Sequence, residues 1–316
     1  MRFSIYQDSQ VGGRTSNQDR MGYCFTRDAL LLLLADGMGG HLHGELAASM
    51  AMQVMGALFQ ERARPTVADP SRLLEDLVFA AHHALHRYRA EHRLPDTPRT
   101  TIVVCIVQQG EAYWAHCGDS RLYWLRSGRI LARTVDHSHV ERLVSLGRLS
   151  PAERLFHPDR NKLYNCVGAP TLPRVEKAAP VRLKSGDQIL LCSDGLWSSI
   201  PEHELAYRLS ARSLELAVPE LVRTAAIAGG KNGDNVTALA LTWMEDERAA
   251  SNDPNTGLSA SPSSMMTDGL PGNRVVTSIH PSDVASEQTP DAQAIERAIA
   301  RFRIAGNNTP TTTSEE

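Results

Sequence analysis

The sequence lacks the features of membrane proteins and of nucleic-acid-binding proteins. Its longest aliphatic run, Ala29 to Ala35, is far shorter than the roughly 20 residues that span a bilayer. The N-terminus MRFSIYQDSQ has neither the apolar core nor the cleavage site of a signal peptide, so we expect a cytoplasmic location. The formal net charge of −3 provides no basic field for a polyanion. We therefore expect neither a membrane nor a nucleic acid as a partner.

Disulfides and several common enzyme motifs are also missing. The five cysteines are odd in number and show no C-x-x-C spacing, and most lie among aliphatic residues, where reduced cysteine acts as a small hydrophobe. They are Cys24, Cys105, Cys117, Cys166 and Cys192. No G-x-x-x-x-G-K-[ST], H-E-x-x-H or G-x-S-x-G occurs. P-loop enzymes, zincins and serine hydrolases are therefore disfavoured.

Composition divides the 316 residues into a folded part and a tail. Residues 249–290 are rich in Ser, Thr, Pro, Gly and Asn and poor in large apolar groups, so they cannot offset the entropy of ordering. We expect a domain over 1–245 and a flexible tail over 246–316. Apolar residues at helical spacing between Ile295 and Phe302 are typical of one short amphipathic helix near 290–305. Partner binding, docking on the chain's own domain and marginal helicity all remain open for it.

Within residues 1–245, strand-like and helix-like segments are mixed. Segments rich in β-branched and aliphatic residues predict strands over 29–35, 101–108, 112–117, 121–125, 188–192 and 236–243. Apolar spacing predicts helices over 44–59, 71–91 and 213–228, the last with a kink or a later start at Pro219. Strands that cluster in hairpin-like pairs, with long helices before and after them, indicate an α+β fold of antiparallel sheets covered by helices.

Five acidic clusters lie at the predicted strand ends or turns. They are Asn17-Gln18-Asp19, Asp36-Gly37-Met38-Gly39-Gly40-His41, Gly118-Asp119-Ser120, Ser193-Asp194-Gly195 and Gly233-Asp234-Asn235. Carboxylates brought together repel one another unless cations hold the group. Hard divalent ions with oxygen ligands suit such a group, and the absence of a Cys/His zinc pattern favours Mg²⁺ or Mn²⁺. The sharp turn after Asp36 would also expose the Gly37 carbonyl as a hard ligand.

Each of these residues also has an ordinary structural explanation. A single Asp-Gly is most often only a turn, and Asp234 could simply begin the strand that follows it. The joint occurrence of such carboxylates after aliphatic strands, with Arg14 upstream of the first, is what favours a site. An arginine there could form a fork for a phosphate dianion.

In order and spacing, these segments resemble the metal-dependent protein serine/threonine phosphatases, the type 2C family, in its bacterial single-domain form. The resemblance covers about residues 5–243 and rests on GGRTSNQD, LLLADGMGGHLHGELAA, RTTIVVCIV, AHCGDSRLYWLRSGRI, DHSHVERLVSLGRLSPAE, HPDRNKL, SGDQILLCSDGLW and GDNVTALALTW. It implies two packed antiparallel β-sheets flanked by helices, an α-β-β-α sandwich, with a metal centre at one edge.

The resemblance also implies roles for individual residues. Asp36 would bridge two tightly bound metals, and Asp194 and Asp234 would complete the first site. The Gly37 carbonyl would serve the second metal, and Asp19 would act there directly or through water.

The same resemblance implies roles for three further residues, and the sequence departs from the family pattern at two positions. Arg14 would take the substrate phosphate, His41 would assist with phosphate or proton transfer, and Asp119 would be a ligand for a third, weaker metal. Gln18 stands where the family often has Glu, which drops a charge and would weaken the second metal. Arg99 stands where the family often has Gly, and the sequence offers no interpretation of it.

The activity implied is hydrolysis of phosphoserine and phosphothreonine by a water that bridges two Mn²⁺ or Mg²⁺ ions, without a phosphoenzyme. No C-x₅-R pattern occurs, which disfavours a cysteine-dependent phosphatase. The expected partners are phosphorylated proteins and the serine/threonine kinase that the enzyme opposes, and the expected form is a monomer. A catalytically silent phosphoprotein-binding regulator with the same fold and a hydrolase of small phosphate esters remain as alternatives.

Overall fold

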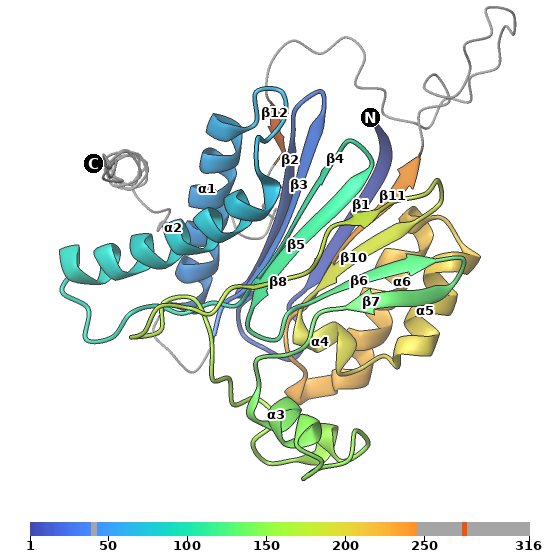
Figure 1. The fold of residues 1–316 in the computed structure, drawn as a ribbon. Coiled ribbons are helices and arrows are strands. Elements are labelled where there is room, and N and C mark those ends of the chain that lie inside the picture. Colours follow the sequence, from blue (N-terminus) through green and yellow to red (C-terminus); the bar gives the residue numbers. More distant parts are fainter. Residues whose placement is uncertain (39–42, 245–273, 277–316) are drawn as a thin grey trace, which may run out of the picture.

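The computed structural model of the chain describes residues 1–38, 43–244 and 274–276 (Figure 1). The strands are β1 (Arg2–Gln10), β2 (Asp19–Phe25), β3 (Ala29–Asp36), β4 (Ile102–Gln108), β5 (Glu111–Cys117), β6 (Arg121–Arg126), β7 (Arg129–Arg133), β8 (Glu176–Lys177), β9 (Val181–Arg182), β10 (Gln188–Cys192), β11 (Val236–Met244) and β12 (Arg274–Val276). The helices are α1 (Gly44–Arg62), α2 (Pro70–Glu91), α3 (His139–Ser145), α4 (Asp194–Trp197), α5 (Glu202–Ala211) and α6 (Leu214–Gly229), with short 3₁₀ turns η1 (Arg154–Phe156) and η2 (Gly230–Asn232).

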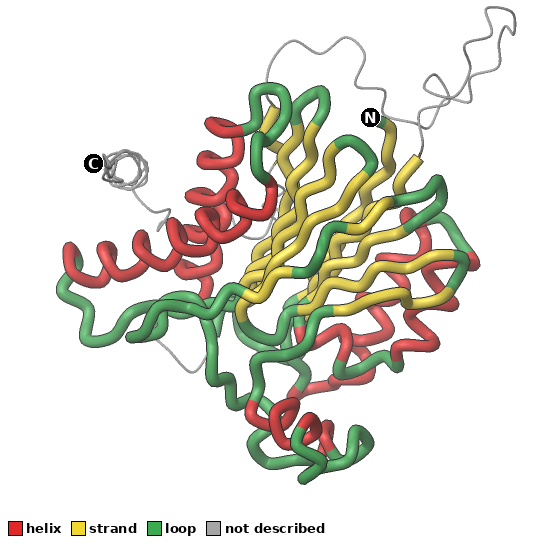
Figure 2. Tube along the Cα trace, in the orientation of Figure 1, coloured by secondary structure: helices red, strands yellow, loops and turns green. Residues whose placement is uncertain are grey.

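The strands form two antiparallel sheets. One has the order β1-β11-β10-β6-β7, and the other has the order β12-β2-β3-β4-β5-β8, with β9 also paired to β5. Figure 2 shows the strands at the centre of the molecule and the helices outside them. Helices α1 and α2 contact the sheet that contains β3, whereas α6 contacts β1 and β11 of the other sheet. The predicted α-β-β-α sandwich is therefore confirmed.

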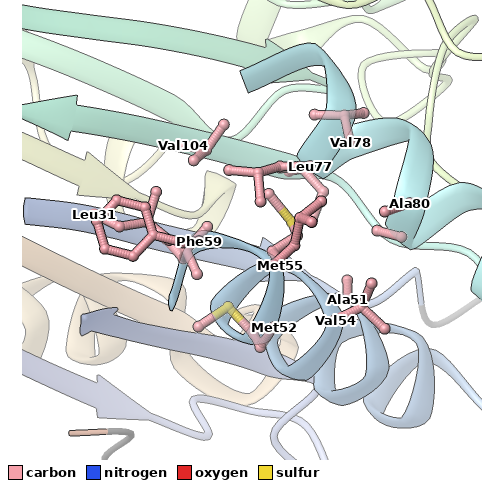
Figure 3. Packing of buried hydrophobic residues seen from close by; sticks show 14 of the residues in the cluster. Leu31, Ala51, Met52, Val54, Met55, Phe59, Leu77, Val78, Ala80 and Val104 are labelled. Carbon is pink, nitrogen blue, oxygen red and sulfur yellow. The ribbon is translucent and has the colours of Figure 1, made fainter. Parts of the chain in front are cut away.

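The apolar run of β3 shows why the sequence folds into these layers. Side chains of a strand point alternately to its two faces. Leu31 and Leu33 pack in the cluster beneath α1 and α2, which Figure 3 shows around Met55, Phe59 and Leu77. The even-numbered leucines of the same strand belong to the cluster between the two sheets. Both faces of β3 are thus buried, and each buried leucine contributes about 1.5–3 kcal/mol of hydrophobic free energy.

The long helices begin where the local sequence favours it. Before α2, the Asp69 side chain accepts a hydrogen bond from the Arg72 N–H, and Pro70 occupies the first turn, where its missing N–H costs nothing. Helix α6 begins at Leu214 and continues through Pro219. Of the two expected alternatives, a kink or a later start, the later start is therefore excluded. Proline near a helix start removes only one backbone hydrogen bond, and the apolar face of α6 packs in the core on that side of the molecule.

The six predicted strands and three predicted helices are all present, and the five cysteines are free and buried. Strands β1, β2, β7, β8, β9 and β12 and helices α3, α4 and α5 were not predicted. Only Phe3 of β1 is buried, and β1 lies at a sheet edge, so its sequence carries no long aliphatic signal. None of the helices in the part of the chain that the structure describes has both the length and the apolar character that a membrane span needs.

Three residues of the expected tail belong to the described part. Strand β12 pairs antiparallel with β2, with Arg274 opposite Phe25. This pairing adds an edge strand to the sheet covered by α1 and α2. The predicted helix near 290–305 lies outside the described residues.

Candidate active site

The carboxylates come together because, in a pair of antiparallel strands, the end of one strand lies next to the start of the other. Asp19 begins β2 and lies opposite Asp36, the last residue of β3. In the other sheet, Asp194 follows the end of β10, and Asp234 precedes the start of β11, its neighbour. Asp119 lies in the turn that carries the chain from β5 in one sheet to β6 in the other. One end of the sandwich therefore gathers residues from both sheets.

A cleft of about 420 Å³ opens at this end. Its lining includes Arg14, Gly37 and four of the predicted carboxylates, namely Asp36, Asp119, Asp194 and Asp234. Asp19 is buried, with 4% of its surface exposed. Burial, and after it repulsion from Asp19 and Asp194, raises the pKa of Asp36 well above its usual range.

Threonines fix the backbone of Asp36. The Asp36 N–H donates to Thr101 Oγ1 at 3.2 Å, and the Asp36 carbonyl accepts from the Thr101 N–H and from Thr100 Oγ1, each at 2.8 Å. Thr101 Oγ1 also lies 2.7 Å from Ser120 Oγ. The two threonines thus tie Asp36 to the turn that carries Asp119.

Two other polar residues hold the remaining segments. Ser193 Oγ donates to Asp19 Oδ2 at 2.7 Å. The Asn235 side chain accepts from the Gln18 N–H at 2.8 Å and donates to the Val11 and Ser16 carbonyls at 2.8 and 3.0 Å. Asn235 therefore connects the start of β11 with the loop before β2.

Crowding and burial raise the pKa of four carboxyl groups. Burial is the largest cause for each, and it raises the pKa of Asp19 to about 6, against a hydrogen bond from Ser193 that lowers it. The pKa of Asp119 rises to about 7 through burial and the charge of Asp136. Burial and neighbouring carboxylates raise the pKa values of Asp36 and Asp194 well above the usual range. Such a group binds protons or cations readily.

The donor set fits hard divalent cations. Among the described residues, Asp19 Oδ1 and Asp194 Oδ1 are buried oxygens without a hydrogen-bond partner. Such atoms are costly unless a ligand satisfies them. Gly37 must be glycine, because a Cβ there would lie 2.2 Å from the Gly44 carbonyl oxygen. Carboxylate and carbonyl oxygens are ligands that suit Mn²⁺ and Mg²⁺.

Arg14 makes a bidentate ion pair with one of the predicted metal ligands. Its Nε and Nη2 donate to the two carboxylate oxygens of Asp234 at 2.9 and 2.6 Å. About half of the Arg14 side chain is exposed. The structure thus places this guanidinium at the mouth of the cleft, and its binding to a substrate phosphate stays a prediction.

The two departures from the family pattern have structural partners. Gln18 Nε2 donates to Glu45 at 3.3 Å, so a carboxylate from the first turn of α1 lies next to the amide. Arg99 forms an ion pair with Asp96 at 3.0 Å, which explains the arginine left without interpretation by the sequence. His41 lies outside the described residues.

The sequence alone missed the residues that position the carboxylates. Ser193 and Asn235 stand beside predicted ligands, and Thr101 begins a predicted strand, yet none received a role. A partial indication of this role was present in the sequence, because small hydroxyl and amide side chains directly beside acidic turn residues are typical of local hydrogen bonding. The partners, however, lie in other strands, which local patterns do not identify.

Two antiparallel sheets between helices, with a multi-carboxylate cleft at one end, define a metal-dependent hydrolase of this sandwich architecture. The family model described as Protein phosphatase 2C matches residues 7–225. The chain therefore belongs to the protein phosphatase 2C family and is a metal-dependent protein phosphatase.

Relatives and solved structures agree with this assignment. The chain is 32% identical to protein phosphatase PhpP of Streptococcus pneumoniae over 239 residues, which cover 75% of this chain and 95% of that protein. It is 31% identical to serine/threonine phosphatase stp of Listeria innocua, over 72% of this chain and 90% of that protein. The catalytic domain of the serine/threonine phosphatase PstP, solved with two manganese ions, is 27% identical and superimposes with a TM-score of 0.66, over 77% of this chain and 99% of that domain.

Proposed function

We propose that this chain hydrolyses phosphoserine and phosphothreonine in proteins, with Asp19, Asp36, Asp194, Asp234 and the Gly37 carbonyl holding two Mn²⁺ or Mg²⁺ ions. The observation that carries this proposal is the crowding of carboxylates with raised pKa values and unsatisfied oxygens in one cleft. Such a group is stable only when cations or protons neutralise it.

The metals would supply Lewis-acid activation of a water and neutralise charge on the phosphoryl oxygens. Each residue of the chain then has a definite task. Asp36, whose backbone Thr100 and Thr101 fix, lines the cleft and would present its carboxylate to both metals. Arg14 would orient the phosphate from the cleft mouth with the fork that pairs with Asp234 in the structure, so taking the phosphate would leave the Asp234 carboxylate to the metal. His41, which follows the same turn, is assigned to phosphate or proton transfer by resemblance only.

The proposed substrates are proteins phosphorylated by a serine/threonine kinase, and the enzyme would reverse that kinase's action in the cytoplasm as a monomer. Names of the relatives support the substrate class, because they are called protein phosphatase and serine/threonine phosphatase. The chemistry at the phosphorus needs only positioning and charge neutralisation, so no covalent phosphoenzyme is required.

Chelation is the direct test of this proposal. We expect phosphate release from an aryl phosphate and from phosphothreonine peptides with Mn²⁺, and at least a hundredfold loss of rate after exhaustive chelation, with recovery when Mn²⁺ returns. Activity that survives chelation would contradict the proposal. Preference for sugar or nucleotide phosphates would instead identify a small-ester hydrolase, and binding without turnover would identify a silent regulator.

We place the phosphatase domain in residues 1–245. The family model spans 7–225, and the last core strand, β11, ends at Met244. A protein shortened to residues 1–245 should keep its Mn²⁺-dependent rate within about twofold, because every predicted site residue precedes that point. The comparison is steady-state kinetics of the two lengths on one aryl phosphate. A larger loss of rate would show that strand β12 or the segments around it support the site.

Asp119 is proposed as a ligand of a third, weaker metal. Asp119 is buried and lines the cleft, and after burial, repulsion from its carboxyl group is the next largest cause that raises the pKa of Asp194. Asp119→Ala should therefore keep two tight Mn²⁺ sites and lower kcat at least about tenfold, since the third ion would act on the substrate or the attacking water. Calorimetric Mn²⁺ titration and steady-state kinetics would measure both effects. Loss of the tight sites, or unchanged kcat at saturating Mn²⁺, would disprove the assignment.

A further inference from the structure

The turn before Asp119 has a backbone conformation that only glycine accepts. Gly118 has a φ of 116°, and a Cβ at this position would lie 2.6 Å from the Cβ of Thr101. L residues rarely adopt such a φ value, and here a side chain would also collide with a neighbouring strand. The position of Asp119 in the cleft therefore depends on what holds the two polar groups of the Gly118 backbone.

One residue, His137, holds both groups. The His137 N–H donates to the Gly118 carbonyl at 2.9 Å, and the Gly118 N–H donates to His137 Nδ1 at 3.2 Å. The His137 side chain is 1% exposed, so its ring is fixed by its surroundings. A loop that lies 19 residues further along the chain thus clamps the turn.

The hydrogen bonds around His137 define its tautomer. Asn165 is oriented by Arg174, whose N–H donates to Oδ1 at 3.0 Å and whose carbonyl accepts from Nδ2 at 2.8 Å. Asn165 Nδ2 therefore faces His137 Nδ1 as a donor, at 2.7 Å. With two donors directed at Nδ1, the proton of the neutral ring belongs on Nε2, which lies 3.3 Å from Glu176 Oε2.

A metal site is the obvious alternative for this cluster. His116, His137 and Glu176 offer ligand atoms within 4.8 Å of one another. A metal on His137 Nε2 would require the proton on Nδ1, which would then face the donors of Gly118 and Asn165. His116 Nε2 already lies 2.7 Å from the Val135 carbonyl. The cluster is thus satisfied as a hydrogen-bond network without an ion.

We propose that His137, held as the Nε2–H tautomer by Asn165 and Glu176, is a positioning residue that sets Asp119 in the metal centre through Gly118. From the other side of the turn, the Trp197 indole N–H donates to the Asp119 carbonyl at 2.9 Å. His137 is not among the residues that line the cleft, so its effect would reach the reaction only through the Asp119 turn. This inference rests on the proposed function of Asp119.

The test uses two substitutions at one position. In His137→Asn, Oδ1 stands close to the place of Nδ1 and can accept from the Gly118 N–H, whereas in His137→Gln the polar atoms lie further out, near the place of Nε2. We expect His137→Gln to lower kcat about tenfold and to weaken the third Mn²⁺ site about tenfold. Calorimetry should show both tight sites unchanged. His137→Asn should stay within about twofold of wild type in both measurements.

Three controls decide the result. Wild type without Mn²⁺-dependent turnover would overturn the proposed function itself, and Asp119→Ala without effect would overturn the proposed role of Asp119, on which this inference rests. If those two behave as expected, equal behaviour of the Gln and Asn variants would overturn the role of His137. Thermal melting of the metal-free proteins must show similar stability. If His137→Gln does not fold, Glu176→Ala is measured in its place. A threefold or larger loss in kcat with intact tight sites supports the inference, and unchanged kcat overturns it.

Discussion

Replacement of Asp36 with asparagine should lower kcat at least a hundredfold at saturating Mn²⁺. Asp36 ends β3 and lines the cleft; burial is the largest cause that raises its pKa, followed by repulsion from Asp19 and Asp194 and then from Asp119 and Asp234. Asparagine keeps the shape and removes the charge that would bind the activating ions. Steady-state kinetics over a range of Mn²⁺ concentrations would show whether added metal restores the rate.

The same substitution should stabilise the metal-free protein. Asp36 is destabilised by burial and by like charges, so a neutral isostere removes that repulsion and should raise the melting temperature. A matched control is Asp28→Asn, just before the other end of β3, where Asp28 pairs with the exposed Arg27. This control should change neither rate nor melting temperature appreciably. Wild-type turnover of Asp36→Asn would show that Asp36 is not part of the metal centre.

The layers of the fold were predictable because both faces of the central strands are buried. The continuous aliphatic runs of β3 and β4 indicate strands that are buried on both faces. The helical spacing of apolar residues between 71 and 91 indicates the buried face of α2. The edge strand β1 was not predictable in the same way, because only Phe3 is buried in it. Two-residue strands such as β8 are too short for any period to appear.

The sequence predicted the carboxylates of the candidate site but not the residues that hold them in place. Acidic residues that directly follow aliphatic strands gave Asp36 and Asp194, and family resemblance gave their roles. The structure gathers these residues through strand pairing, which a single sequence does not encode locally. His137 illustrates the limit: its partners Gly118, Asn165 and Glu176 lie in three separate segments, so no spacing rule links them.

Stability of the metal-free protein should fall as the pH rises above about 6.5. The pKa of Asp119 is about 7 in the folded state, against an ordinary value of 3.8, and those of Asp36 and Asp194 are also well above it. Until the pH passes these folded-state pKa values, the folded state holds protons that the unfolded chain has lost, so the free energy of unfolding decreases with pH. Buried His82 and His137, with pKa values lowered to about 4, oppose this trend only below about 6.5, where histidines of the unfolded chain become charged.

Each carboxyl group that stays protonated only in the folded state contributes about 1.4 kcal/mol per pH unit. Above pH 6.5 the melting temperature of the chelated protein should therefore fall until the pH passes the folded-state pKa values of these groups. Saturating Mn²⁺ should reverse the slope, because metal binding needs ionised ligands and becomes tighter as protons leave. Asp36→Asn without metal should show a shallower slope than wild type, since one repelling carboxyl group is gone. A metal-free melting temperature that stays flat or rises over this range would mean that the carboxylates are neutralised within the protein itself, and the cleft would then have no electrostatic need for divalent ions.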